Sequence, residues 1–223
     1  MKFFSVVDNP TFKLCFQLMA FLGLRISEAV KVNVSDIDFK NRMIRVYSPK
    51  TGNIDFLYLH DEIYELLENR VRTDEIMEHD GYLLHPQYCS GSKRKHVSKN
   101  CVRSHFRRYL KAAGLDDAYA IINNTGGQPG SKRQLYRLST HSLRHYFITR
   151  VYKKTLDPMI TQRLARHSSF NTTQVYINMA KNDDVNGMKK AFDENEGPKE
   201  SSNLEPTELY QFIQFYEEWK KRR

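Results

Sequence analysis

The most apolar stretch of the chain is Pro10–Leu22, where hydrophobic side chains would face nearly every direction around a helix. This pattern predicts a helix buried at the centre of the fold rather than an amphipathic surface helix. The pair Gly23-Leu24 is expected to end that helix. A second short helix is expected to follow, capped by the Ser27 side chain and running through Lys31.

The pattern then changes, and Asp36–His60 predicts a small antiparallel sheet. Two of its strands, Met43–Tyr47 and Ile54–Leu59, flank a segment that contains Pro, Gly and Asn. These are turn-forming residues, so we expect a hairpin. The hairpin would place Lys50 at its exposed tip.

Apolar positions spaced three and four residues apart indicate further helices, several with capping residues before them. The stretch Asp117–Leu138 is rich in Asn, Gly and Pro, and it is predicted to be a loop. Together the elements predict a mainly α fold with a small antiparallel β-sheet, of the α+β class. The predicted helices cover Asp61–Arg72, Lys99–Ala113 after Ser98, a segment from Thr140, Pro158 to about Arg166 after Asp157, and Thr172–Met179.

Residues 1–180 are predicted to form one domain. Residues 181–205 are polar and contain Gly197-Pro198, which is typical of a linker. Residues 206–223 are predicted to form a C-terminal helix. Its apolar stripe would either fold back on its own domain or dock on a neighbouring subunit, and we favour the second interpretation. The stripe consists of Leu209, Phe212, Ile213, Tyr216 and Trp219.

Charge suggests the kind of partner. The 223 residues include 35 Lys and Arg against 26 Asp and Glu, a formal net charge of +9. This excess favours a polyanion, with nucleic acid ahead of an anionic membrane surface. Cys15, Cys89 and Cys101 are odd in number and far apart, which favours a reducing, intracellular location. The longest apolar run is too short to cross a bilayer, so no membrane association is expected.

Basic residues are densest between Gly91 and Leu115, where the chain contains no acid. A charged helix face is usually just solvated, but this density favours a face that contacts DNA. The loop near residue 130 adds two further cations. The candidate DNA-binding residues are Lys93, Arg94, Lys95, Arg103, Arg107, Lys132 and Arg133.

A cluster with catalytic potential lies between Thr140 and Tyr176. His141 and Arg144 are three residues apart and therefore share one face of a helix. His167 and Tyr176 follow on the next helical segments. Phosphate chemistry fits this set, because arginines bind phosphate oxygens, histidines move protons and tyrosine attacks. Nothing in the chain has the spacing of a metal-ligand cluster, so neither a metal nor another cofactor is expected.

These residues occur in segments that resemble the motifs of the tyrosine recombinase (phage integrase) family, in the family's order and spacing. The matching segments are Gly23–Glu28, Ser48–Gly52, His141–His145, Leu164–Ser169 and Thr172–Tyr176.

The resemblance implies a role for each position. Tyr176 would be the nucleophile, Arg25 and Arg144 would bind the scissile phosphate, and Glu28 would support Arg25. Lys50 would protonate the leaving 5′ oxygen, His141 would act as a base toward the tyrosine, and His167 would donate to a phosphate oxygen.

The resemblance therefore implies a site-specific DNA recombinase, an integrase of a virus or mobile element. It would cut and rejoin double-stranded DNA without metal or ATP, in a synaptic tetramer that the 206–220 helix helps to link. Whether Tyr176 cuts at its own subunit's site or a neighbour's stays open. The alternatives are a type IB topoisomerase and a truncated, non-catalytic DNA-binding regulator.

The chain departs from the family pattern in two places. Arg166 stands where the family usually has glycine, directly before His167. Most members also carry a helical domain ahead of the catalytic one, and the two domains clamp DNA. Almost nothing precedes Pro10 here, so we expect either a fragment or a naturally short form.

Overall fold

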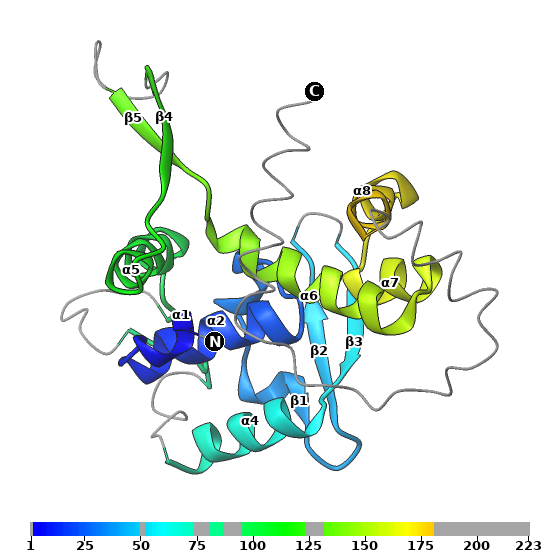
Figure 1. Ribbon diagram of the computed structural model, residues 1–223. Helices are drawn as coiled ribbons and strands as arrows, with labels where there is room; N and C mark the ends of the chain where they lie inside the picture. Colours follow the sequence, from blue (N-terminus) through cyan, green and yellow to red (C-terminus); the bar gives the residue numbers. More distant parts are fainter. Residues whose placement is uncertain (1, 50–51, 74–80, 87–94, 124–131, 181–223) are drawn as a thin grey trace, which may run out of the picture. The chain divides into compact units, whose positions relative to one another are not determined.

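The computed structural model describes residues 2–49, 52–73, 81–86, 95–123 and 132–180 (Figure 1). Within them, helices predominate over two small antiparallel sheets, which confirms the predicted α+β class. The chain divides into an N-terminal unit, Lys2–Phe147, and a C-terminal unit that begins at Ile148. The predicted linker 181–205 and the predicted helix 206–223 lie outside the described residues.

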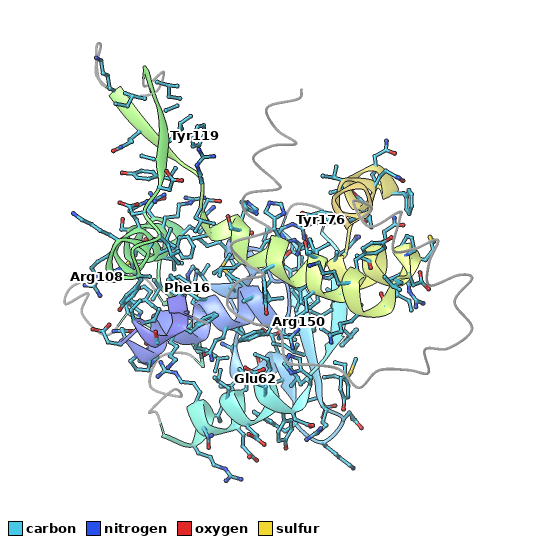
Figure 2. The ribbon with its side chains drawn as sticks, viewed as in Figure 1. Phe16, Glu62, Arg108, Tyr119, Arg150 and Tyr176 are labelled. Carbon is cyan, nitrogen blue, oxygen red and sulfur yellow. The ribbon has the colours of Figure 1, made fainter. Side chains whose placement is uncertain are left out.

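Helix α2 (Pro10–Phe21) forms the centre of the N-terminal unit. Asn9 caps it, because the side-chain Oδ1 accepts the amide protons of Thr11 and Phe12 at 3.0 and 3.2 Å. Helices α3, α4 and α5 all contact α2. Phe16 is fully buried and packs against the ring of Phe106 from α5 (Figure 2). The predicted buried helix is confirmed.

Helix α3 (Ile26–Ala29) begins earlier than the sequence indicated. Its N-cap is Arg25, whose main-chain N–H donates to Glu28 Oε2 at 2.8 Å. The expected Ser27 cap is therefore wrong: Arg25 and Glu28 start the helix at Ile26, so Ser27 lies inside the first turn. Helix α3 also ends at Ala29 rather than at Lys31.

A short 3-10 turn (Val34–Asp36) leads into a three-stranded sheet of β1 (Ile37–Asp38), β2 (Met43–Tyr47) and β3 (Ile54–Tyr58). All neighbours are antiparallel, and Tyr47 pairs with Ile54 at the end of the hairpin. Ser48 N–H donates to the Asn53 carbonyl at 2.9 Å and closes the turn. The predicted hairpin is confirmed, while its tip residue Lys50 lies outside the described residues.

Helix α4 (Asp61–Thr73) is tied to the core through Arg70, a buried arginine. Its Nη2 donates to Thr11 Oγ1 at 3.1 Å and to the Leu83 carbonyl at 3.2 Å. Both Leu83 and Leu84, in the short connection that follows Gly81, are fully buried. One guanidinium thus fixes α4 against α2 and this connection.

Helix α5 (Lys99–Ala112) has the predicted Ser98 cap, since Ser98 Oγ accepts the Cys101 amide at 3.2 Å. Val102, Phe106 and Leu110 form its inner stripe and are buried. The opposite face carries the basic side chains.

The predicted loop over Asp117–Leu138 is wrong. Strands β4 (Ala118–Asn123) and β5 (Lys132–Tyr136) form a two-stranded antiparallel ribbon that projects beyond α5 (Figure 1). The Asn, Gly and Pro residues at 123–130 dominated the prediction. The β-forming run Tyr119–Ile122 was the signal for a strand, but its partner lies across that tract.

Helix α6 (Thr140–Thr155) passes from the N-terminal unit into the C-terminal unit. Within the C-terminal unit, α7 (Pro158–Ala165) contacts α8 (Phe170–Ala180). Asp157 caps α7 as predicted, accepting the Met159 and Ile160 amides at 2.7 and 3.0 Å. No helix within the described ranges has the length and apolar character needed to cross a membrane.

Candidate active site

Arg25 and Glu28 form an ion pair at the start of α3. Arg25 Nη1 lies 2.8 Å from Glu28 Oε1, and the other Glu28 oxygen accepts the Arg25 main-chain N–H. The Glu28 side chain is fully buried, whereas Arg25 keeps 26% of its side chain exposed. The carboxylate therefore holds the guanidinium in place while part of the arginine side chain remains exposed to solvent. The predicted contact between these residues is confirmed.

Arg144 on α6 reaches the same turn. This buried guanidinium donates from Nη1 to the main-chain carbonyl of Gly23, two residues before Arg25. Gly23 has φ +63°, and a Cβ there would lie 2.3 Å from Cδ1 of Phe147. Glycine is therefore needed for both the backbone conformation and the close approach of α6. Two arginines far apart in the sequence are brought to one turn.

Two histidines on α6 lie within this positive field. Although solvent reaches His141, burial lowers its pKa below the ordinary value, and the charges of Arg144, Arg103 and Arg25 lower the pKa further. Burial lowers the pKa of His145 to about 4, with additional contributions from His141 and Arg144. Both imidazoles are therefore neutral at neutral pH, and a neutral imidazole can accept a proton.

The predicted DNA-binding residues of the N-terminal unit fall into different environments. Arg103 is exposed on α5, where it bonds to Asn100 at 2.9 Å and its charge acts on His141. Lys95 and Lys132 are also exposed.

Arg107 is only half-exposed, and its guanidinium is bound within the N-terminal unit. It forms an ion pair with Asp116 at 2.6 Å, donates to the Leu138 carbonyl at 3.0 Å, and lies over the Tyr136 ring at 3.3 Å. Tyr136 at the end of β5 and Leu138 just after it lie against Arg107, an arrangement that the sequence did not reveal. Arg107 anchors the base of the ribbon.

In the C-terminal unit, His167 lies beside Tyr176. Their rings stack at a centroid distance of 5.9 Å with 27° between planes, and His167 Nδ1 is 3.0 Å from Thr173 Oγ1. Tyr176 is on α8 and is buried (Figure 2). The fully buried Thr173 therefore fixes the orientation of the imidazole next to the phenol. The turn between α7 and α8 brings together two residues that the sequence placed on separate segments.

Arg166 has a clear conformational role. It adopts φ +53° and ψ +47°, the left-handed conformation that glycine favours at helix ends. The Arg166 amide donates to the Arg163 carbonyl at 2.9 Å, and the His167 amide donates to the Gln162 carbonyl at 3.1 Å. This Schellman motif fixes the backbone that presents His167, with an arginine carrying the strain that glycine would avoid.

Several predicted positions lie outside the described residues. They are Lys50, Lys93, Arg94 and the side chain of Arg133.

Sequence reasoning missed three residues that hold or adjoin the candidate side chains, two in the N-terminal unit and one in the C-terminal unit. His145 follows His141 by one helical turn, a spacing that already put it on the same face. Thr173 follows His167 by six residues across a turn, and no helical spacing relates the two. The sequence identified Gly23 as a helix breaker, but nothing in the sequence could predict its contact with Phe147 of α6.

Solved structures share this fold. The crystal structure of XerA recombinase superposes with a TM-score of 0.62 at 20% identity, over 89% of this chain and 61% of that one. The Tn1549 transposon integrase, solved in complex with transposon right end DNA, gives a TM-score of 0.58 at 17% identity, over 83% and 63%. The fold is that of tyrosine recombinase catalytic domains.

Sequence comparison adds the family. The tyrosine recombinase XerA of Saccharolobus solfataricus is 28% identical over 179 residues, which are 80% of this chain and 50% of that protein. The sequence model of the phage integrase family matches residues 6–183, and the chain belongs to this family. The chain spans about half the length of the curated relatives it matches.

Proposed function

We propose that this chain carries the catalytic centre of a site-specific DNA recombinase. The observation that carries the proposal is the Arg144–Gly23 contact, which places two arginines and the neutral His141 around one turn. The pair of His167 and Tyr176 in the C-terminal unit supplies a phenol and a second imidazole. Family membership and relatives named tyrosine recombinases support the same reaction.

In the proposed reaction, the Tyr176 oxygen attacks a DNA phosphodiester. A phosphorus–oxygen bond forms to the tyrosine, and the bond to the 5′ oxygen breaks. His141 accepts the phenol proton, and Lys50 gives a proton to the leaving 5′ oxygen. The products are a 3′-phosphotyrosyl link and a free 5′ hydroxyl. The link conserves the phosphodiester bond energy, so a second 5′ hydroxyl reseals the strand without ATP.

The arginines act on the charge of the transition state. Arg25 and Arg144 bind the non-bridging oxygens, Glu28 holds Arg25, and His167 donates to a phosphate oxygen. Fixed donors stabilise the extra negative charge of the five-coordinate phosphorus without reorganisation during the reaction. No metal ion is needed for this scheme.

The biological setting is part of the proposal. The similarity to a transposon integrase supports an origin in a virus or mobile element. Recombination would proceed in a tetramer on double-stranded DNA inside the cell, with residues 206–220 linking subunits. Residues 1–180 would form the catalytic domain.

The decisive experiment uses a nicked suicide substrate, on which a covalent protein–DNA adduct accumulates. We expect the wild-type chain to form this adduct, and Tyr176→Phe to form none while keeping its gel-shift affinity. If the wild-type chain binds DNA but forms no adduct, the enzyme proposal fails and a non-catalytic regulator is the better reading. Resolution of a synthetic four-way junction separates a recombinase from a type IB topoisomerase, which would relax a supercoiled plasmid instead.

A further inference from the structure

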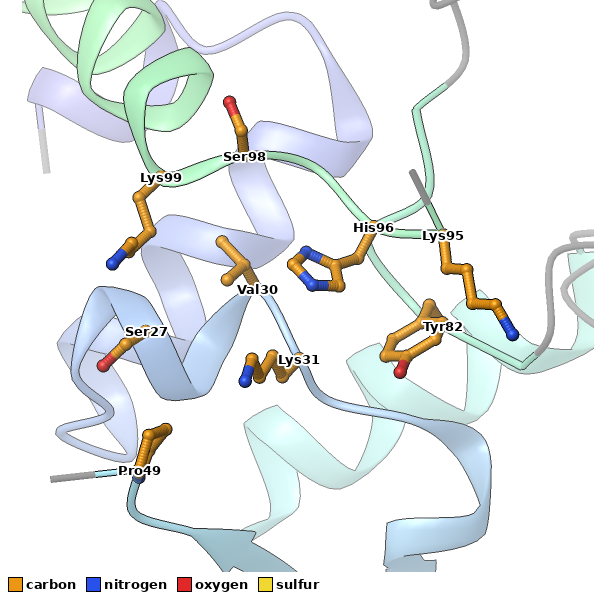
Figure 3. Close-up of a pocket in the computed structure, with 9 residues that line it drawn as sticks. All are labelled: Ser27, Val30, Lys31, Pro49, Tyr82, Lys95, His96, Ser98 and Lys99. Carbon is orange, nitrogen blue, oxygen red and sulfur yellow. The ribbon is translucent and has the colours of Figure 1, made fainter. Parts of the chain in front are cut away.

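A basic pocket lies beside the Arg25 turn, within the N-terminal unit. It has a volume of about 510 Å³ (Figure 3). None of the described residues that line it is acidic. They are Ser27, Val30, Lys31, Pro49, Tyr82, Lys95, His96, Ser98 and Lys99.

Three side chains give the pocket its chemistry. The Ser27 hydroxyl and the ammonium groups of Lys31 and Lys99 are directed toward the same side of the pocket (Figure 3). Glu28, the acid nearest to Lys31 along the chain, is fully buried and paired with Arg25. It therefore does not neutralise the two lysines. Two ammonium groups and one hydroxyl around an open hollow suit a phosphate group.

His96 adds an oriented ring. Its Nδ1 lies 3.0 Å from the Val97 carbonyl, and because a carbonyl only accepts, Nδ1 carries the proton. The ring is also held against Tyr82, with centroids 5.4 Å apart. Tyr82 and Val30 provide an apolar wall, which a free inorganic anion does not need but a sugar would contact.

The position of the pocket indicates where the phosphate comes from. Ser27 follows Arg25 on α3, and Pro49 directly precedes the hairpin tip. Lys99 and Arg103 are one turn apart on the same face of α5, and the charge of Arg103 acts on His141. Basic groups therefore continue from the arginine turn into the pocket.

We infer that this pocket binds a backbone phosphate of DNA next to the one held by Arg25. The inference rests on the proposed function and names two lysines that act there, Lys31 and Lys99. They position the strand by neutralising its charge and carry no base specificity. The shared chemistry, a phosphate group, also occurs in free anions, and the experiment distinguishes the two sources.

The test measures binding of a short duplex across a salt series, in the Tyr176→Phe background so that no covalent step contributes. Each phosphate contact adds about 0.9 to the slope of log K against log salt. In the variant that combines Lys31→Gln with Lys99→Gln, we expect the slope to be less steep by about one. We expect the affinity for DNA to fall roughly tenfold. Ser27→Ala is expected to weaken binding without changing the slope.

The control removes the same two charges elsewhere, with Lys13→Gln and Lys40→Gln. Both residues are exposed, Lys13 on α2 and Lys40 in the turn before β2, at the opposite end of that strand from Pro49. Equal slopes for the two double variants would overturn the inference. Melting temperatures are also measured with inorganic pyrophosphate. The pocket would be assigned to a free anion if pyrophosphate raised the melting temperature of the Tyr176→Phe protein but not of its Lys31→Gln/Lys99→Gln variant, while the two double variants gave equal DNA slopes.

The outcome is separable from that of the proposed function. If the pocket and control double variants differed in slope but the wild-type chain formed no adduct, the proposed enzymatic function would be refuted. The pocket would still be a DNA contact. Adduct formation with equal slopes would keep the enzyme and reject the pocket.

Discussion

The guanidinium of Arg144 donates a hydrogen bond to the main-chain carbonyl of Gly23. This contact joins the start of α6 to the turn that positions Arg25, so the two predicted phosphate-binding arginines share one support. A disturbance of the turn should therefore reach both arginines.

Gly23→Ala tests the turn itself. A left-handed alanine costs about 1–2 kcal/mol, and the clash of its Cβ with Phe147 adds about 1–3 kcal/mol. Gly52→Ala is the matched control, because Gly52 has φ +72° but nothing within 4 Å of its Cβ position. We expect urea denaturation to show a larger loss of unfolding free energy for Gly23→Ala. Equal losses would mean that the contact with Phe147 is unimportant.

Arg144→Ala is expected to slow adduct formation on the suicide substrate by about 10²–10³-fold, through lost stabilisation of the transition state. Arg144→Lys should recover little, because an ammonium cannot reproduce the guanidinium geometry. Arg150→Ala, at an exposed position of the same helix, serves as the control. Rates are measured at saturating DNA, with melting curves to verify folding. Cleavage by Arg144→Ala at the rate of the control would count against the phosphate-binding role.

His145 should make stability depend on pH. Its pKa falls from the ordinary 6.5 to about 4 on folding, so the unfolded chain binds this proton at a higher pH than the folded chain. The free energy of unfolding therefore has its full value, as far as His145 is concerned, above pH 6.5, and it decreases as the pH falls from 6.5 to about 4. The shift corresponds to about 3 kcal/mol.

The measurement is urea denaturation across that pH range for the wild-type chain and His145→Gln. The variant should lose less stability on acidification, although His141, whose pKa is also lowered, will leave part of the slope. Parallel curves for the two proteins would refute the role of His145.

Arg166 allows strain and side-chain contacts to be separated. Arg166→Gly and Arg166→Ala both remove the guanidinium, but only glycine relieves the left-handed strain. We expect the glycine variant to be more stable than the alanine variant by about 1 kcal/mol in denaturant titrations. If both variants lose DNA affinity equally, the guanidinium contacts DNA. Unchanged affinity would leave Arg166 with a backbone role alone.

The sequence predicted the elements whose signals are local. The buried helix α2, the hairpin β2–β3 and the capped helices α5 and α7 each depend on residues close together in the chain. The ribbon β4–β5 escaped prediction because its strands pair across a tract whose composition is typical of a loop. Arg107 was misplaced for the same reason, since its partners Asp116, Leu138 and Tyr136 are set by that ribbon.

The amino-acid sequence by itself determined the mainly helical fold, the positive charge, and which side chains have the chemistry for phosphate transfer, because periodicity, charge and motif order are properties of the chain. Only the tertiary structure decided that Arg144 bonds to Gly23, that His145 is half-buried beside His141 and Arg144, and that Lys31 and Lys99 share a pocket. Those relationships depend on helix packing, which juxtaposes residues that no sequence spacing connects. The left-handed Arg166 is the remaining case: its position was visible in the sequence, but its conformation was fixed by the hydrogen bonds that end α7.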